Sequence, residues 1–158
     1  MPEKFKRELT MSILATPEMA NFYGNLHGGD LLRMADQVAY ACSARYCAND
    51  TVTLSVDGVL FKEPIHIGEL ITFRACINYV GRTSMEVGIR VEAEHVQTRT
   101  VRHTNSCYFT MVAMKDGKPV EIPPLVIENE LQRRRFCAAE KRRQQRKAAE
   151  HDNDCNCG

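Results

Sequence analysis

One carboxylate stands alone in a stretch of small and apolar residues, which makes it a candidate for chemistry. Between Arg33 and Arg45 the sequence MADQVAYACSA contains a single carboxylate, that of Asp36. Burying an unpaired carboxylate is costly, so Asp36 must be solvated, paired or used. Near the mouth of a pocket it could act as a general base toward water or as a nucleophile. The alternative is a structural carboxylate that is hydrogen-bonded to loop amides or held at a subunit interface.

The residues before this stretch supply a complementary set of hydrogen-bond donors. In NFYGNLHGGD, residues 21–30, Gly28 and Gly29 stand at the start of an expected helix, where backbone N–H groups lack partners. These groups could bind a developing oxyanion, and Asn21 could donate its side-chain amide to the same carbonyl. His27 could be a base, but beside two glycines it more simply fixes the loop. The structural alternatives are a tight turn and an asparagine bonded to its own backbone.

Periodicity indicates the elements that must position these residues. Residues 30–47 place apolar side chains at a spacing of three to four, which predicts a helix of about five turns with one buried face: Leu31, Met34, Ala35, Val38, Cys42 and Tyr46. Small residues on its other faces indicate that other elements enclose it. Strand patterns occupy residues 8–16, 51–61, 69–79, 84–97 and 100–114.

This order of elements predicts an α+β protein. A sheet of that size against one nearly neutral helix is most simply a hotdog fold, an antiparallel sheet of five to six strands wrapped around a central helix, here with an added C-terminal helix. We expect a single hotdog domain over residues 1–126, a basic helix over residues 127–150 and a flexible tail over residues 151–158. The basic stretch 131–147 has no continuous apolar stripe, which favours a solvated helix.

Composition limits the remaining function classes. The 158 residues fit one domain, and 44% hydrophobic with 26% charged residues is typical of a packed globular protein. A net charge of +1 gives no nucleic-acid signature, and no apolar run approaches the roughly 18 residues of a membrane span. The first residues lack the apolar core of a signal peptide, so we expect a cytoplasmic protein with reduced thiols. Cys155 and Cys157 alone are a weak zinc signal, and we expect no metal site.

Three ordered motifs resemble those of hotdog-fold acyl-CoA thioesterases, close to the bacterial broad-range acyl-CoA hydrolases. The first is N21-F-Y-G-N-L-H-G-G-D-L-L-R-M-A-D36, in which an Asn precedes a Gly, then His-Gly-Gly, then an acidic residue two turns into the helix. The others are T53-L-S-V-D-G-V-L-F-K-E-P-I-H-I-G68 and V80-G-R-T-S-M-E-V87. The resemblance covers roughly residues 8–126 of the chain.

The resemblance implies an enzyme that hydrolyses fatty acyl-CoA to free fatty acid and CoA. Asp36 would be the general base or nucleophile, and Asn21 with the N–H of Gly28 or Gly29 would polarise the thioester carbonyl. The substrate and its coenzyme A would be bound by His27, Val80, Gly81, Arg82, Thr83 and Ser84, with Arg82 on a phosphate. The alternative for this last segment is a plain hairpin turn in which Gly81 supplies a positive φ.

The resemblance also implies an assembly. Two hotdogs pair edge to edge, and each site takes its Asn loop from one chain and its acidic helix from the other. The chain would therefore at least dimerise and, as bacterial relatives do, form a trimer of dimers. Coenzyme A enters only as part of substrate and product, with no other cofactor and no nucleic acid as a specific partner.

Two questions stay open at this point. The basic helix could lie beside the coenzyme's 3′-phosphate, or meet RNA or anionic lipid non-specifically, instead of being merely solvated. The alternative function is a non-catalytic module that senses acyl-CoA. A hotdog dehydratase is disfavoured because such enzymes pair a His with an acid in a different loop arrangement.

Overall fold

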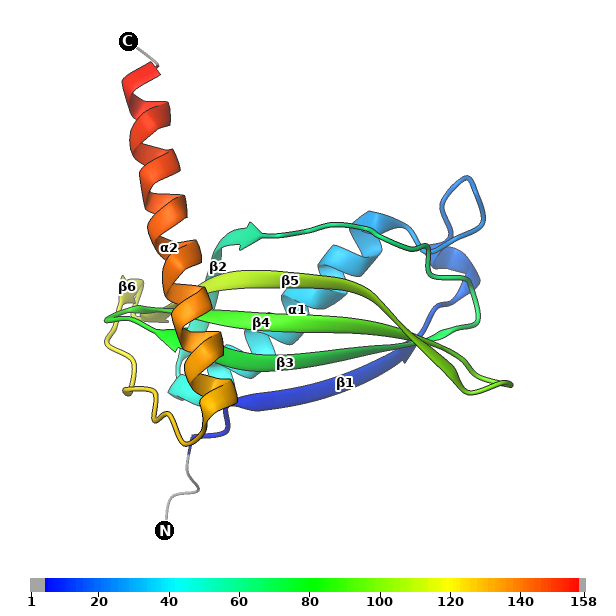
Figure 1. The fold of residues 1–158 in the computed structure, drawn as a ribbon, viewed down its shortest axis with the longest axis horizontal. Coiled ribbons are helices and arrows are strands. Elements are labelled where there is room, and N and C mark those ends of the chain that lie inside the picture. The colour runs from blue at the N-terminus through cyan, green and yellow to red at the C-terminus, as the bar shows by residue number, and fades with distance from the viewer. Residues whose placement is uncertain (1–4, 157–158) are drawn as a thin grey trace.

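A computed structural model describes residues 5–156 of the chain, with side chains described through residue 154. The elements are β1 (Glu8–Leu14), a short 3-10 helix (Pro17–Met19), α1 (Gly28–Cys47), β2 (Asp50–Asp57), β3 (Leu70–Val80), β4 (Ser84–His95), β5 (Thr100–Lys115), β6 (Lys118–Pro119) and α2 (Glu130–Asn156). The strands form one antiparallel sheet in the order β1-β3-β4-β5-β2, with β6 added beside β5. Helix α1 lies behind this sheet and α2 crosses its front (Figure 1). The predicted hotdog architecture is confirmed.

Helix α1 packs on the sheet through the face that periodicity predicted. All six expected side chains are buried, together with Ala39, Ser43 and Cys47. The Ser43 hydroxyl accepts or donates a hydrogen bond of 2.7 Å to the Thr51 hydroxyl, which ties α1 to β2. The opposite face of α1 is exposed at Asp36, Gln37 and Tyr40. The expectation that the helix is enclosed on several faces is therefore wrong for a single chain, because one sheet covers only one side.

The strands alternate as expected, with one set of side chains toward α1 and the other toward α2. In β4, Met85, Val87, Ile89 and Val91 are in the core that includes α1. Their neighbours Glu86 and Arg90 point to the other face of the sheet. Strand β2 ends at Asp57, four residues before the predicted end, and Gly58 follows it with φ of +68°. That left-handed residue turns the chain out of the strand.

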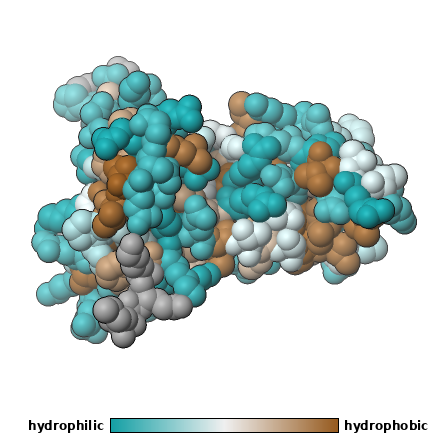
Figure 2. Space-filling view, turned by 60° about the horizontal axis from the view of Figure 1, so that its bottom comes forward, coloured by the Kyte–Doolittle hydropathy of each residue, from teal (hydrophilic) through white to brown (hydrophobic). Residues whose placement is uncertain are grey.

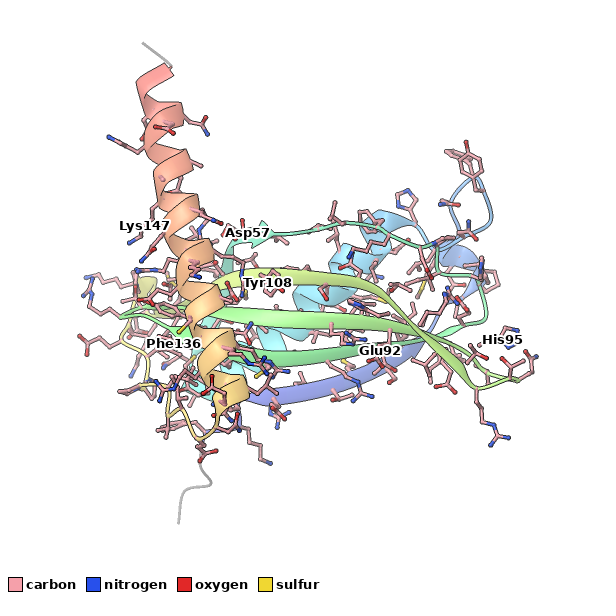
Figure 3. The ribbon with its side chains drawn as sticks, viewed as in Figure 1. Asp57, Glu92, His95, Tyr108, Phe136 and Lys147 are labelled. Carbon is pink, nitrogen blue, oxygen red and sulfur yellow. The ribbon has the colours of Figure 1, made fainter. Side chains whose placement is uncertain are left out.

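Helix α2 docks on the outer face of the sheet, so it is not simply solvated. Ala139 is 1% exposed, and the Phe136 ring packs on Tyr79 of β3 with centroids 4.9 Å apart. Figure 3 shows Phe136 where the helix crosses the strands. The helix continues through residues 151–156, which we expected in a flexible tail, because neither Gly nor Pro interrupts residues 130–156.

Figure 2 shows hydrophobic residues as separate patches among hydrophilic ones, on the side where the β1 edge comes forward. No helix within residues 5–156 has the length and apolar character needed to cross a membrane.

Candidate active site

The loop before α1 is organised by Asn21. Its amide oxygen Oδ1 accepts hydrogen bonds from the backbone N–H groups of Tyr23 and Asn25, at 2.9 Å and 3.1 Å. This is the structural role that the sequence left open, and it uses only the oxygen of the amide. The nitrogen Nδ2 makes no hydrogen bond within the described residues. Because the oxygen is fixed by two donors, Nδ2 stays available to donate to a ligand.

The two glycines at the start of α1 differ in what their N–H groups do. His27 is the N-cap residue, and its Nδ1 accepts a hydrogen bond of 3.1 Å from the N–H of Gly29. His27 therefore fixes the loop, and the Gly29 donor is used inside the chain. The N–H of Gly28 meets no acceptor in the described part of the chain. Of the two N–H groups predicted to hold an oxyanion, that of Gly28 is the one without a hydrogen-bond acceptor among the described residues.

Asn21 and Gly28 share a pocket of about 370 Å³. Its other lining residues are mostly apolar: Asn25, Leu26, Leu31, Phe61, Glu63, Pro64 and Ile65. A Cβ at residue 28 would lie 3.3 Å from the Phe61 ring, so a side chain there would crowd the pocket. The pocket thus has two residues with N–H donors in its wall, and donors held in place in this way can polarise a carbonyl oxygen.

Asp36 is exposed on α1 and is held by one hydroxyl. The Thr53 hydroxyl of β2 donates a hydrogen bond of 2.5 Å to Oδ1 of Asp36. Thr53 lies at a β-bulge, where the register with β5 shifts between Thr53 and Ser55. The other carboxylate oxygen has no partner within residues 5–154. The carboxylate of Asp36 is thus oriented through one of its two oxygens.

Thr53 was missed as a functional residue by the sequence analysis. It lies in the second resembling motif, but threonine is common in strands and carries no chemical signal of its own. Its only signal in the sequence was its place at the start of that motif. The contact depends on a tertiary approach of β2 to α1.

A single chain does not bring the carboxylate and the two donors together. Gly28 and Asp36 are eight residues apart on α1, which is about 12 Å along the helix axis. Asp36 is also absent from the lining of the pocket that holds Asn21 and Gly28. A general base must lie within hydrogen-bond reach of the water it activates. The Asp36 carboxylate and the donors of Asn21 and Gly28 therefore lie on different parts of the surface of one chain.

The segment predicted to bind coenzyme A is a hairpin turn between β3 and β4. The N–H of Gly81 donates to the carbonyl of Ser84 at 2.8 Å, which closes the turn. Gly81 is not among the residues with positive φ, so that proposed reason for the glycine is wrong. The side chain of Arg82 is exposed and has no partner in the described residues. Its contact with a phosphate stays a prediction.

The cysteines and the possible metal ligands within the described residues add no further candidate chemistry. Burial raises the pKa of Cys42 and of Cys107 to about 12, which keeps both thiols protonated and unreactive. No group of three or more His, Cys, Asp or Glu side chains in the described residues is arranged to hold a metal ion. Cys157 and the side chain of Cys155 lie outside the described residues.

A partly buried ion pair supports the wall of the pocket. Arg102 of β5 forms a bidentate contact with Glu69, with N–O distances of 2.5 Å and 3.0 Å. Arg102 also donates to the carbonyl of Pro64 at 2.7 Å and to Glu63 at 3.1 Å. The N–H of Leu26 donates to the carbonyl of Ile65 at 2.7 Å. The ion pair thus holds the segment on which the Asn21 loop rests.

This pair sets the charge state of Glu69. The carboxylate is 3% exposed, and its burial opposes ionisation. Hydrogen bonds from Arg102 and from the N–H of His66 outweigh that burial and lower the pKa of Glu69 below its ordinary value of 4.5.

The fold is that of a hotdog protein, and the residues Asn21 and Gly28 line one pocket beside the start of α1. The sequence profile of the thioesterase superfamily matches residues 23–100. Protein VdlD of Helicobacter pylori is 55% identical over 141 residues, which are 89% of this chain and 81% of VdlD. The uncharacterized acyl-CoA thioester hydrolase YkhA of Bacillus subtilis is 36% identical over 115 residues, 72% of this chain and 67% of YkhA. The chain therefore belongs to the thioesterase superfamily, among its acyl-CoA thioester hydrolases.

Solved structures agree with this assignment. An acyl-CoA hydrolase from Staphylococcus aureus, in complex with butyryl coenzyme A, coenzyme A and coenzyme A disulfide, matches with a TM-score of 0.87 and 26% identity. The match covers 96% of this chain and 93% of that one. An apo-hexameric acyl-CoA thioesterase matches with a TM-score of 0.88 and 29% identity, over 92% of this chain and 94% of the other.

Alanine variants of the S. aureus hydrolase match as well, at 25%, 25% and 24% identity. They replace an asparagine, an aspartate and a threonine, which follow one another in that order along the S. aureus chain.

We predict that Glu69→Gln lowers the free energy of unfolding at neutral pH by about 2 kcal/mol, because Arg102 loses its charged partner in a buried site. Since the folded pKa of Glu69 lies below 4.5, its contribution is complete above that value and is lost as the pH falls through the folded pKa. Denaturant unfolding of the wild-type protein and of Glu69→Gln, from neutral to acid pH, measures their free energies of unfolding. The difference between these two free energies should become smaller below pH 4.5. Glu63→Gln, at the exposed partner of Arg102, is the control and should cost less than about 1 kcal/mol. A difference that is constant with pH would contradict this role.

Proposed function

We propose that this protein hydrolyses the thioester of acyl-CoA at sites formed between two chains. The observation that carries the proposal is the division of the machinery within one chain. The donors of Asn21 and Gly28 line the pocket, whereas the carboxylate of Asp36 lies about 12 Å further along α1 and is exposed. A second chain that brings its Asp36 to this pocket would complete the arrangement. In the same dimer, the first chain would bring its Asp36 to the pocket of the second.

The proposed reaction uses each group at a stated atom. Nδ2 of Asn21 and the N–H of Gly28 bind the thioester oxygen, which becomes negative as water attacks the carbonyl carbon. Asp36 takes a proton from that water. The tetrahedral intermediate then breaks its C–S bond, Asp36 returns the proton to the leaving sulfur, and the products are CoA and a carboxylic acid. Attack by Asp36 itself, through an anhydride that water then hydrolyses, is the alternative route.

The spacing along the sequence supports these roles. Asn21, Asp36 and Thr53 follow one another in the order of the asparagine, aspartate and threonine that are substituted in the S. aureus hydrolase. Both separations between successive members are the same in the two chains. We infer that Thr53 is a positioning residue, because its hydroxyl holds Oδ1 of Asp36 and leaves the other oxygen for the water.

The β2 edge supports the pairing of two chains. Strand β2 ends the sheet, so its outer backbone groups lack a strand partner in the described chain. Val52, Leu54 and Val56 on this strand are 49%, 64% and 41% exposed. A second copy laid against β2 would satisfy the backbone and cover these side chains. Assembly of such dimers into a hexamer is part of the proposal, and two of the similar structures are described as hexameric.

Several finer points remain parts of this proposal. The acyl group is that of a fatty acid, and the reaction needs no cofactor beyond the coenzyme A of the substrate. The turn around Arg82 binds that coenzyme, and the protein works in the cytoplasm. A module that binds acyl-CoA without turnover is the competing function, and multiple turnovers with palmitoyl-CoA and a thiol reagent would exclude it.

We predict that Asp36→Asn lowers kcat for palmitoyl-CoA by at least about a hundredfold, because the base that activates water is lost. The melting temperature should stay within a few degrees, since the side chain is exposed and makes a single described hydrogen bond. The measurements are release of free CoA and a thermal melt. Asp116→Asn, in the exposed turn before β6, removes an equal charge and should leave both values unchanged. If Asp36→Asn retained wild-type turnover, the proposed role of Asp36 would be wrong.

A mixing experiment tests the shared site. Asn21→Ala and Asp36→Ala should each be nearly inactive alone. If sites form between chains, co-refolded mixtures regain activity, because each mixed dimer holds one site with both residues intact. With random pairing, half of the dimers are mixed and half of their sites are complete, which gives about a quarter of wild-type activity. Mixtures that stay inactive, although mass measurements show mixed dimers, would place each site within one chain.

A further inference from the structure

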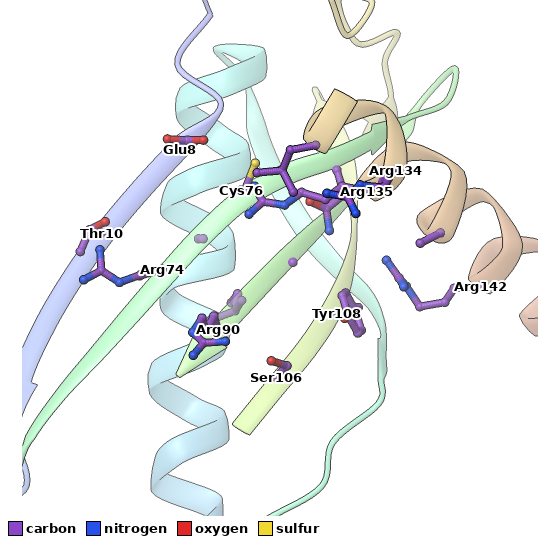
Figure 4. A pocket seen from close by; sticks show the side chains of 16 residues that line it. Glu8, Thr10, Arg74, Cys76, Arg90, Ser106, Tyr108, Arg134, Arg135 and Arg142 are labelled. Carbon is purple, nitrogen blue, oxygen red and sulfur yellow. The ribbon is translucent and has the colours of Figure 1, made fainter. Parts of the chain in front are cut away.

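The segment of residues 58–64, between β2 and β3, places an aromatic ring on the first residue of α1. This segment forms neither helix nor strand. Three ring atoms of Phe61 would lie 3.3–3.7 Å from a Cβ on Gly28, so the ring rests directly on this glycine. The contact is beside α1, on the other side of the sheet from Arg74 and Arg90, which Figure 4 shows on the outer face. Phe61 thus forms a wall of the pocket that Asn21 and Gly28 also line.

The segment is held to the sheet on both sides of Phe61. Asn105 of β5 is 3% exposed, and its Nδ2 donates a hydrogen bond of 2.9 Å to the carbonyl of Leu60. On the other side, Arg102 of β5 donates to the carbonyl of Pro64 at 2.7 Å. These two carbonyls are both fixed to the same strand, and the short backbone between them limits how far the ring can move.

Part of the Phe61 ring borders open space in the pocket. The side chain is 54% exposed although it touches Gly28. The alternative is a ring that only shields the start of the helix. A ring packed for stability alone would gain most from full burial, because the gain grows with the apolar area removed from water. The exposed area of this ring is therefore available to a bound group.

The position of the ring determines what a bound thioester would meet. A carbonyl oxygen that accepts a hydrogen bond from the N–H of Gly28 would lie about 2.9 Å from that nitrogen. Because the Phe61 ring rests on the same residue, the substituents of the carbonyl carbon would lie close to it. An unbranched chain can run along a flat ring. A branch at the carbon next to the carbonyl needs width at the place that the ring occupies, and extra atoms in a filled space are unfavourable.

We propose that Phe61 is a specificity-determining residue, which admits unbranched acyl groups and disfavours acyl groups branched at the carbon next to the thioester carbonyl. The inference rests on the proposed function, because it needs a thioester bound at Gly28. An apolar pocket discriminates one added or missing methylene group by about 10- to 200-fold. The placement of a single methyl group against the ring is therefore enough to give a measurable preference.

The test compares butyryl-CoA with isobutyryl-CoA, which have the same composition and differ in the placement of one methyl group. The kcat/KM for each is measured by release of free CoA, in the wild-type protein, in Phe61→Ala and in the conservative variant Phe61→Leu. Leu60→Ala is the matched control, since Leu60 is an apolar neighbour that is 64% exposed and does not line the pocket. Both esters are measured on the same preparation. Partial unfolding and the intrinsic hindrance of the branched ester therefore cancel when the ratios of different variants are compared.

We expect the wild-type protein to prefer butyryl-CoA by at least about tenfold in kcat/KM. Phe61→Ala should lower this preference at least about fivefold, because the wall that meets the branch is removed. Phe61→Leu should lower it in the same direction, since a flexible side chain replaces the flat ring. Leu60→Ala should leave the preference unchanged.

The inference is overturned if the wild-type protein has no such preference, or if Leu60→Ala lowers it as much as Phe61→Ala. It is also overturned if the preference is unchanged in Phe61→Ala, or in Phe61→Leu where Phe61→Ala does not fold. A wild-type protein that does not hydrolyse butyryl-CoA would contradict it too, because an unbranched acyl group must pass the ring. Turnover of palmitoyl-CoA separates these results from the proposed function. If palmitoyl-CoA is hydrolysed, only the role of Phe61 is wrong, whereas a wild-type protein that hydrolyses none of the three esters overturns both.

Discussion

The packing of α1 against one curved sheet is the constraint on which the rest of the structure depends. Small residues such as Ala35, Ala39 and Ser43 are almost fully buried and let the helix approach the strands closely. A helix that buries one face in this way must leave the opposite face to solvent or to another chain. Asp36 lies on that opposite face, and the free N–H of Gly28 lies at the helix start, beside the Asn21 loop. The fold therefore separates the Asp36 carboxylate from the Gly28 N–H by about two helical turns, and in the proposed function a second chain joins them.

The edge strand β2 positions the carboxylate on the exposed face of α1. Its bulge follows Thr53, and bulges are common next to active sites because they redirect a side chain and end regular pairing. Thr53 is thereby placed on Asp36, while the apolar side chains further along the strand are exposed. A copy bound at this edge would exclude water around the carboxylate, where charge interactions gain strength as the local dielectric falls. The same edge would thus supply both the assembly and the surroundings of the carboxylate that we propose as the base.

Local periodicity predicted the fold well, because burial on one face leaves a repeating pattern in the sequence. The six apolar positions of α1 and the five long strands follow from that pattern. The contacts that support the site do not repeat. Arg102 and Glu69 are 33 residues apart, and their pairing depends on how the loop after β2 folds back on β5. Helix α2 docks through Phe136, Ala139 and the aliphatic stems of arginines. These residues form no apolar stripe in the sequence, so the pattern predicted a solvated helix instead.

The alternation of the strands separates the two faces of the sheet and limits how they can influence each other. Arg90 points to the outer face of the sheet, beside α2, while its neighbours Ile89 and Val91 are 2% and 0% exposed in the core around α1. A ligand that moved β4 would have to disturb that close-packed core, which resists small displacements. Helix α2 is held differently, through polar contacts such as Arg142 with Glu86 and Arg146 with Asp57. A change on this outer face would therefore alter the position of α2 more readily than that of the strands.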